Sequence, residues 1–171
     1  VVVVGGVAGG ASAAARVKRL NENADVVVFE KGSDVSFSNC GLPYYLSGTV
    51  EDSEDLIMMT PAAFRKKHDI DVRVHSEAVS IDREKKTVTV RSTETGETYE
   101  QPYDKLVLSP GANPIVPPAL KGADRENVFT IRNVRDIVAL KTFLDKPETK
   151  RVFVVGGGFI GIEAAENLQL A

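Results

Sequence analysis

Short apolar runs and glycine-rich turns alternate along this chain, and their spacing predicts its secondary structure. Four valines open the chain, a glycine-rich stretch follows, and small residues lead to a second apolar run at 24–31. Continuous apolar runs of this length, bounded by glycine, are typical of strands that are buried on both faces and pair in parallel. Residues 1–30 therefore predict a strand, a helix and a second, parallel strand.

The middle of the chain predicts one short helix and several further strands. Thr60 precedes Pro61, and a hydroxyl cap followed by proline is typical of a helix start. We expect residues 70–82 to form a strand that continues past a bend. Apolar and polar residues alternate on both sides of a Thr-Gly turn over 86–101, which predicts a hairpin. Residues 103–114 predict another strand, ended by a Pro-Gly pair.

The last third of the chain repeats the pattern of its start. Pro114, Pro117 and Pro118 mark a linker. An amphipathic pattern over 133–144 predicts a helix. Residues 150–168 then predict a strand, a glycine turn and a helix, about 150 residues after the first copy.

Composition narrows the classes of function. The net charge of -3, the sequence pI of about 5.5 and the lack of a long basic run exclude an electrostatic footprint for nucleic acid. No run of about 18 apolar residues predicts a membrane span. The single cysteine excludes a disulfide within the chain and is typical of a reducing cytoplasm. We expect a cytoplasmic protein with no nucleic-acid partner, no membrane contact and no metal site.

The two ends of the chain are unusual for a complete protein. There is no initiator methionine, and the chain opens inside an apolar run. It stops within a helical pattern, with no glycine or proline to end the helix. We therefore expect this chain to be a fragment.

The second glycine turn carries the stronger dinucleotide signature. Gly156, Gly158 and Gly161 match the pattern G-x-G-x-x-G between a predicted strand and a predicted helix. These glycines permit a tight turn, close approach of the backbone to a pyrophosphate, and close packing of helix on strand. The free N–H groups of the helix N-terminus favour phosphates. The alternative is a tight packing turn without a ligand.

The first glycine turn departs from this pattern. Gly5 and Gly10 occupy the outer positions, but Val7 stands where the middle glycine is expected. Glu30 follows Gly10 by twenty residues, at the end of the second predicted strand. A carboxylate there can accept both hydrogen bonds of a ribose diol, whereas the alternative is a solvated charge. The predicted fold class is α/β, with two Rossmann-like dinucleotide-binding domains. Such a pair indicates a tightly held flavin and an exchangeable nicotinamide.

The only cysteine, Cys40, lies in the stretch SFSNCGLPYYL at 36–46. A lone cysteine is more often a small buried residue than a reactive one. Here the polar lead-in and the Gly-Leu-Pro exit supply the hydrogen-bonding groups and the bent backbone that a working thiol needs. Only the thiolate attacks sulfur, and this stretch by itself leaves both a structural and a reactive Cys40 open.

Five motifs carry a family resemblance, and in this order they cover nearly the whole chain: GGVAGGASAAAR, VVVFEK, SFSNCGLPYYLSG, YDKLVLSPGANP and VVGGGFIGIEAAE. With them the chain resembles the pyridine nucleotide-disulfide oxidoreductases, and most of all their single-cysteine branch. That branch contains the coenzyme A-disulfide reductases, with NADH oxidases and peroxidases as near relatives.

The resemblance implies the domain organisation and the cofactors. It implies an FAD domain with an antiparallel β-meander over 1–112, and a linker with the beginning of an NAD(P)H domain over 113–171. Later segments outside this chain would complete both domains and add a C-terminal interface domain that forms a homodimer. The implied cofactors are FAD and NADH or NADPH, and the residues that choose between the two nicotinamides lie outside this sequence.

The catalytic residue implied by the resemblance is Cys40, beside the flavin ring. Relatives with two active cysteines have C-x-x-x-x-C, but here Tyr45 stands at the second position. The oxidised enzyme would hold a mixed disulfide with coenzyme A in the disulfide reductases, or a sulfenic acid in the oxidases and peroxidases. Asn39 before the cysteine, with LPYY after it, favours the coenzyme A branch.

Coenzyme A carries a 3′-phosphate and a pyrophosphate, so its site needs cations. Ser12, Arg16 and Arg19 are four and three residues apart and share one face of the first predicted helix. The resemblance implies that these residues contact coenzyme A together with Ser36 and Asn39. The alternative is a solvated basic face.

By the same resemblance, two sets of residues contact the cofactors. The set for FAD is Gly5, Val7, Ala8, Gly9, Gly10, Glu30, Lys31, Asn39, Cys40, Ala78, Ser109, Pro110, Gly111 and Arg132. The set for NAD(P)H is Gly156, Gly158, Ile160, Gly161 and Glu163. Glu163 would face the nicotinamide side of the flavin ring, and Ala78 would meet the adenine through its backbone.

Three further functions stay open at this point. An NADH oxidase or peroxidase would cycle Cys40 through a sulfenate, with oxygen or peroxide as oxidant. A polysulfide or coenzyme A-persulfide reductase would use the same thiol to attack sulfane sulfur. The alternative from a different class is a flavin-binding redox sensor or interaction protein.

Overall fold

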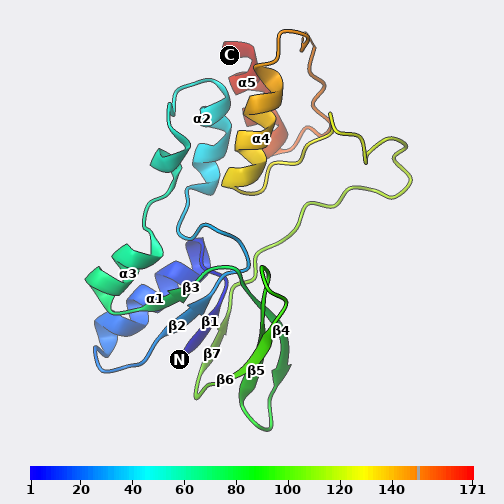
Figure 1. The fold of residues 1–171 in the computed structure, drawn as a ribbon. Helices are drawn as coiled ribbons and strands as arrows, with labels where there is room; N and C mark the ends of the chain where they lie inside the picture. Colours follow the sequence, from blue (N-terminus) through cyan, green and yellow to red (C-terminus); the bar gives the residue numbers. More distant parts are fainter. Residues whose placement is uncertain (150) are drawn as a thin grey trace. The chain divides into compact units, whose positions relative to one another are not determined.

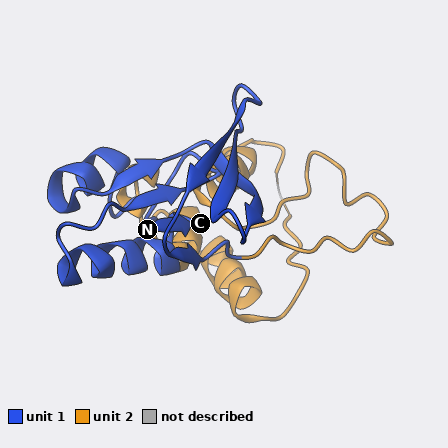
Figure 2. Ribbon diagram, turned by 90° about the horizontal axis from the view of Figure 1, so that it is seen from below, with its two compact units in different colours: residues 1–37, 57–111 blue, residues 38–56, 112–171 orange. Residues whose placement is uncertain are grey.

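A computed structural model describes residues 1–149 and 151–171 (Figure 1). The described residues form two compact units, which Figure 2 colours separately. One unit comprises 1–37 and 57–111, and the other comprises 38–56 and 112–171. These units are compact bodies, and they are not the predicted FAD and NAD(P)H domains. The boundary between those two domains after residue 112 stays a prediction.

The first unit is built on a four-stranded parallel sheet. Its strands, in spatial order, are β3 (Asp71–Arg73), β2 (Val27–Phe29), β1 (Val2–Val4) and β7 (Leu106–Leu108). Val3 of β1 pairs with Val28 of β2 and with Val107 of β7. The predicted strand–helix–strand unit and the predicted strand before the Pro-Gly pair are thus confirmed.

Two helices pack against one face of this sheet: α1 (Ala8–Leu20) and α3 (Pro61–His68) (Figure 1). Thr60 caps α3 by accepting a hydrogen bond from the Ala63 N–H, which confirms the predicted helix start. The apolar cluster between helices and sheet includes Val3, Ala14, Val28, Phe64 and Ile70.

A three-stranded antiparallel meander covers the other face. It consists of β4 (Ser76–Asp82), β5 (Thr87–Ser92) and β6 (Thr98–Pro102), and its second hairpin is the one predicted. Val2 and Phe29 form a buried cluster with Val88 and Val90 of β5. Val2 and its neighbour Val3 are therefore buried on opposite faces of the sheet. This explains why β1 is an unbroken run of valines rather than an alternating strand.

The single strand predicted over 70–82 is in fact two strands that belong to different sheets. β3 ends at Arg73, β4 begins at Ser76, and His75 between them has a φ of 51°. The His75 N–H donates to the Gly32 carbonyl at 3.0 Å. The predicted bend is thus the point at which the chain leaves the parallel sheet for the meander.

The second unit is helical. A 3-10 turn, Asn39–Gly41, contains the cysteine and leads into α2 (Leu42–Leu46). A second 3-10 turn, Ser53–Leu56, follows. α2 packs against both α4 (Val134–Leu144) and α5 (Phe159–Leu170). Both long helices were predicted, so these predictions are confirmed.

The strand of the second strand–turn–helix copy does not form. Residues 151–155 have no strand assignment, and Lys150, the first residue of that predicted strand, lies outside the described residues. Phe153 is 80% exposed and Val155 is 86% exposed. A strand needs a neighbour for its N–H and C=O groups, and no described strand pairs with 151–155. The strand prediction is therefore wrong for this chain, whereas the α/β class is confirmed.

The turn between β1 and α1 brings the helix closer to the strand than a side chain would permit. Gly5 has a φ of 94°, in the region that favours glycine. A Cβ on Gly10 would overlap the carbonyl oxygen of Gly5, and it would lie 3.1 Å from Val3 Cγ1. Glycine at these two positions is therefore required by the packing.

No helix among the described residues is long and apolar enough to cross a membrane.

We predict that Gly10→Ala lowers the free energy of unfolding by about 3 kcal/mol or more, at the upper end of overpacking effects. The overlapping atom belongs to the backbone and cannot rotate away. Gly9→Ala is the matched control, because its Cβ would lie 3.2 Å from the Ser109 Oγ, which can turn. Urea unfolding measures the difference, and equal midpoints for the two variants would contradict the packing account.

Candidate dinucleotide and thiol sites

The N-terminus of α1 presents free backbone donors at the glycine turn. The first intrahelical hydrogen bond runs from the Ala11 N–H to the Val7 carbonyl, and the Val7 cap supplies no side-chain bond. The N–H groups of Ala8, Gly9 and Gly10 therefore have no helical partner. Because the positive end of the helix dipole lies there too, the turn suits a phosphate.

Two backbone donors hold the Glu30 carboxylate in place. Its Oε2 accepts from the Gly6 N–H at 2.9 Å, and its Oε1 accepts from the Gly32 N–H at 2.9 Å. Each carboxylate oxygen has a further lone pair, so the group keeps two acceptor positions. A fixed carboxylate with two acceptors matches the two hydroxyls of a ribose.

The segment after β7 lies against the same turn. Ser109 donates its N–H to the Val4 carbonyl at 2.8 Å. A Cβ on Gly5 would overlap the Ser109 carbonyl. Gly111 follows with a φ of 70°. The structure thus brings together the glycine turn and the predicted Ser109–Gly111 segment.

Other predicted residues of the first unit lie in different places. Ser36, with a φ of 51°, donates its N–H to the Gly6 carbonyl at 2.9 Å. Lys31 is exposed just after β2. Ala78 pairs with Val90 and packs against the cluster between sheet and meander. Ser36 therefore belongs with the glycine turn, and Ala78 belongs with the meander.

Ser12, Arg16 and Arg19 are all exposed on α1, as expected from their spacing. Lys18, by contrast, pairs with Asp69 at 3.2 Å. None of the ion pairs formed by residues 1–149 and 151–171 engages Arg16 or Arg19. Both guanidinium groups are therefore available to an anion.

Cys40 is exposed in a 3-10 turn that its neighbours fix. Ser38 caps this turn by accepting a hydrogen bond from the Gly41 N–H at 3.1 Å. A Cβ on Gly41 would lie 2.9 Å from the Ser38 Oγ and 3.0 Å from a methyl group of Leu56, so a larger residue would displace the capping serine. The thiol is free, and the backbone around it is bent as predicted.

Arg132 joins the linker to the residue before the cysteine. Its Nη1 donates to the Asn39 Oδ1 at 3.4 Å, and its Nε donates to the Ala112 carbonyl at 2.5 Å. Its backbone N–H donates to Asp136 at 3.0 Å. Two predicted residues, Asn39 and Arg132, are thus brought together. Sequence reasoning missed Asp136, whose N–H donates to the side chain of the N-cap Asn133, and an asparagine three residues before an acidic residue is a signal of a helix start.

The second glycine turn repeats the geometry of the first. Gly156 has a φ of 116°, and a Cβ on Gly161 would overlap the Gly156 carbonyl. Gly158 is the N-cap of α5, and its carbonyl accepts a hydrogen bond of the first helical turn. Backbone donors of that turn, including the Ile160 N–H, have no helical partner. Glu163 is half-buried on the same helix. This turn also suits a phosphate.

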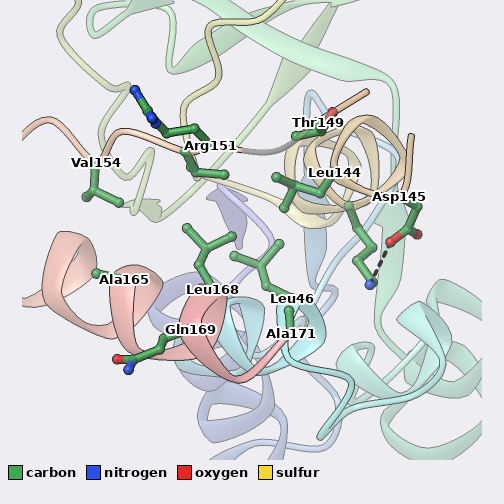
Figure 3. Close-up of a pocket in the computed structure, with 12 residues that line it drawn as sticks. Leu46, Leu144, Asp145, Thr149, Arg151, Val154, Ala165, Leu168, Gln169 and Ala171 are labelled. Atoms are coloured by element: carbon green, nitrogen blue, oxygen red, sulfur yellow. Dashed lines mark hydrogen bonds and ion pairs between the residues drawn. The ribbon is translucent and has the colours of Figure 1, made fainter. Parts of the chain in front are cut away.

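A hollow of about 500 Å³ lies among α2, α4 and α5 (Figure 3). Leu46, Leu144 and Leu168 are among its lining residues. Lys141 lies at the hollow and pairs with Asp145 at 2.8 Å. None of the lining residues is one that the sequence predicts for a site. The turns and the thiol therefore stay the candidate sites.

Both turns suit a dinucleotide at a helix N-terminus, and the chain carries a single thiol in a built turn. The chain belongs to the pyridine nucleotide-disulphide oxidoreductase family, whose sequence profile matches residues 1–171. The resemblance that the five motifs carry is thereby confirmed.

Three proteins show how close the likeness is. A coenzyme A disulfide reductase of Staphylococcus haemolyticus is 42% identical over 168 residues, which are 98% of this chain and 37% of that enzyme. The structure of reduced Bacillus anthracis CoADR-RHD matches with a TM-score of 0.93 and 46% identity, over 99% of this chain and 30% of that one. A NAD-dependent persulfide reductase from A. fulgidus matches with a TM-score of 0.93 and 37% identity, over 99% of this chain and 31% of that one. The chain thus spans about a third of the length of these relatives.

Proposed function

We propose that the protein containing this chain is an FAD-dependent NAD(P)H oxidoreductase that reduces coenzyme A disulfide through Cys40. The observation that carries the proposal is the exposed single thiol in its capped turn, with Tyr45 in place of a second cysteine. The likeness to a coenzyme A disulfide reductase over 98% of this chain supports the choice of substrate.

The residues of the two glycine turns fit two dinucleotides. At the first turn, the N-terminus of α1 binds the FAD pyrophosphate, and Glu30 accepts hydrogen bonds from the ribose. At the second turn, the N-terminus of α5 binds the pyrophosphate of NAD(P)H, with Glu163 on the nicotinamide side. When bound, FAD accepts hydride from the nicotinamide and supplies two electrons to sulfur.

Cys40 carries out the exchange with the disulfide. Its thiolate attacks one sulfur of coenzyme A disulfide, a Cys40–coenzyme A disulfide forms, and the first coenzyme A leaves as a thiolate. Cys40 then accepts two electrons, its bond to coenzyme A breaks, and the second coenzyme A leaves. One disulfide, two electrons and two protons thus give two thiols, and Cys40 returns as a thiolate.

The exposed face of α1 supplies the cations for the substrate. Arg16 and Arg19 bind the phosphates of coenzyme A, and Ser12 lies on the same face. Ser36 and Asn39 complete the contacts. This assignment, homodimer formation and a cytoplasmic location are predictions that rest on the resemblance and on the cysteine count.

A coenzyme A persulfide is the second candidate substrate. It is supported by the likeness to a persulfide reductase, whose TM-score of 0.93 equals that of the CoADR-RHD structure. The same thiolate attack applies, with a sulfane sulfur in place of the disulfide. Steady-state rates of the holoenzyme on coenzyme A disulfide, coenzyme A persulfide, peroxide and oxygen test the proposal. Turnover of only peroxide or oxygen would replace it with an oxidase or peroxidase, and slow turnover of all four would favour a redox sensor.

Cys40→Ser is expected to abolish coenzyme A disulfide reduction while FAD stays bound. The oxygen of serine cannot form the mixed disulfide, and the flavin-binding turn does not include the thiol. Absorbance of bound flavin and steady-state rates measure the two effects. A variant that keeps a rate near that of the parent would show that the exchange occurs elsewhere.

Glu30→Ala is expected to weaken FAD binding by roughly tenfold or more, since hydrogen bonds to a charged group are worth about 1.5–3 kcal/mol. The variant also leaves the Gly6 and Gly32 N–H groups without their acceptor. Glu100→Ala, at an exposed position of β6, is the matched control. Titration of the apoprotein with FAD measures both affinities, and equal values would remove Glu30 from the site.

Arg19→Ala is expected to raise the KM for coenzyme A disulfide roughly tenfold, and to change kcat little. A small disulfide that lacks the 3′-phosphate should show no such increase, and high salt should reduce the effect because Arg19 is exposed. Arg83→Ala, another exposed arginine, is the control. Equal changes on the two substrates would indicate that Arg19 supports the helix rather than the ligand.

A further inference from the structure

A buried amide lies at the packing of α2 against α5. Asn167 is 3% exposed, and it is the one buried polar residue among residues 1–149 and 151–171. Its Nδ2 donates to the Glu163 carbonyl at 2.9 Å, and its Oδ1 accepts from the Ser47 Oγ at 2.7 Å. A leucine would fill this space without the cost of burying an amide. What Asn167 adds is a pair of directional hydrogen bonds, not additional buried apolar surface.

The orientation of this amide follows from the chemistry of its partners. The Glu163 carbonyl only accepts hydrogen bonds, so the amide nitrogen of Asn167 must face it. The amide oxygen then faces Ser47 and accepts from its hydroxyl at 2.7 Å, a shorter contact than the 3.1 Å from the same hydroxyl to the Tyr44 carbonyl. Thr49 Oγ1 lies 3.0 Å from the Ser47 Oγ and is free to donate to it. A directed chain of three hydrogen bonds therefore runs from Thr49 to the backbone of α5.

This chain of hydrogen bonds ties the cysteine segment to the helix of the second glycine turn. Ser47 is the C-cap of α2, seven residues after Cys40. α2 has five residues, and a helix of that length is not stable by itself. Its apolar contacts at Leu42 and Leu46 are non-directional, whereas the bond from Ser47 to Asn167 fixes its rotation.

We propose that Asn167 is a positioning residue, which sets the cysteine-bearing segment 38–47 against α5 through its hydrogen bond with Ser47. Loss of either partner lets the segment rotate and changes the presentation of the Cys40 thiol. The proposal rests on the proposed function only for the identity of the disulfide, since the placement of the thiol is measurable without it.

The test measures the rate at which Cys40 of the reduced holoenzyme is alkylated by iodoacetamide, read by mass spectrometry of its peptide. Ser47→Ala removes the donor and keeps the bond between Asn167 and Glu163, so this variant is expected to fold. Asn167→Ala removes both bonds. Ser47→Thr keeps the hydroxyl and serves as the rescue variant, and Gln169→Ala removes an exposed amide from the same helix as the matched control.

We expect Ser47→Ala and Asn167→Ala each to change the alkylation rate by roughly fivefold in the same direction, the range of one net hydrogen bond. The double variant should match the single variants, because both lack the same contact. Ser47→Thr and Gln169→Ala should stay within about twofold of the parent. The rate of coenzyme A disulfide reduction should fall in the same two single variants.

The proposal is overturned if the two variants melt at lower temperature but keep the parent's alkylation rate, because the bond is then only structural. It is also overturned if the effects of the single variants multiply in the double variant, since the two residues would act separately. A parent enzyme that reduces neither coenzyme A disulfide nor persulfide contradicts the proposed function, while the alkylation rates still decide the role of Asn167.

Discussion

The close approach of a helix to the glycine turn before it is the constraint on which the rest of the structure depends. Gly10 lies so near the Gly5 carbonyl that only hydrogen fits as its side chain. This contact places the helix N-terminus, with its free N–H groups, at the carboxyl end of β1. Gly161 and Gly156 repeat the contact before α5, although no described strand precedes them. The same close contact of glycine with a carbonyl therefore recurs at both turns, and each turn suits a phosphate.

The position of the Glu30 carboxylate beside the first glycine turn depends on the antiparallel meander, although the meander does not line that turn. The Glu30 N–H donates to the Arg73 carbonyl at 2.9 Å, so the backbone of β3 helps to hold it. The Arg73 guanidinium lies 5.6 Å from the centre of the Phe29 ring and donates to the Tyr99 hydroxyl of β6 at 3.1 Å. Burial of the guanidinium works against its charge, but the hydrogen bonds with Tyr99 and Asp71 outweigh it and raise the pKa of Arg73 above its usual value. The meander thus helps to position the strand end from which Glu30 projects.

Patterns set by neighbours in the sequence could be predicted, and contacts between distant residues could not. The buried strands, the capped helix and the glycine turn each follow from local chemistry, and the glycine spacing located Glu30. Residues 151–155 share the apolar pattern of β1 yet form no strand, because periodicity does not supply the neighbouring strand. The change of sheet at His75 depends on pairing in the same way. The bond between Arg132 and Asn39 joins residues 93 positions apart, and such a contact leaves no periodic signal.

The absence of a second thiol decides which chemistry suits the cysteine. Tyr45 occupies the position of a partner cysteine, and this chain contains no other, so oxidised Cys40 ends either as a sulfenic acid or as a disulfide with an outside thiol. A sulfenic acid persists only where the protein shields it from reaction with other thiols and from further oxidation. Cys40 is exposed in the described chain, on a turn capped by Ser38. An outside thiol with negatively charged phosphates would match the exposed Arg16 and Arg19, which supports the proposed disulfide exchange with coenzyme A.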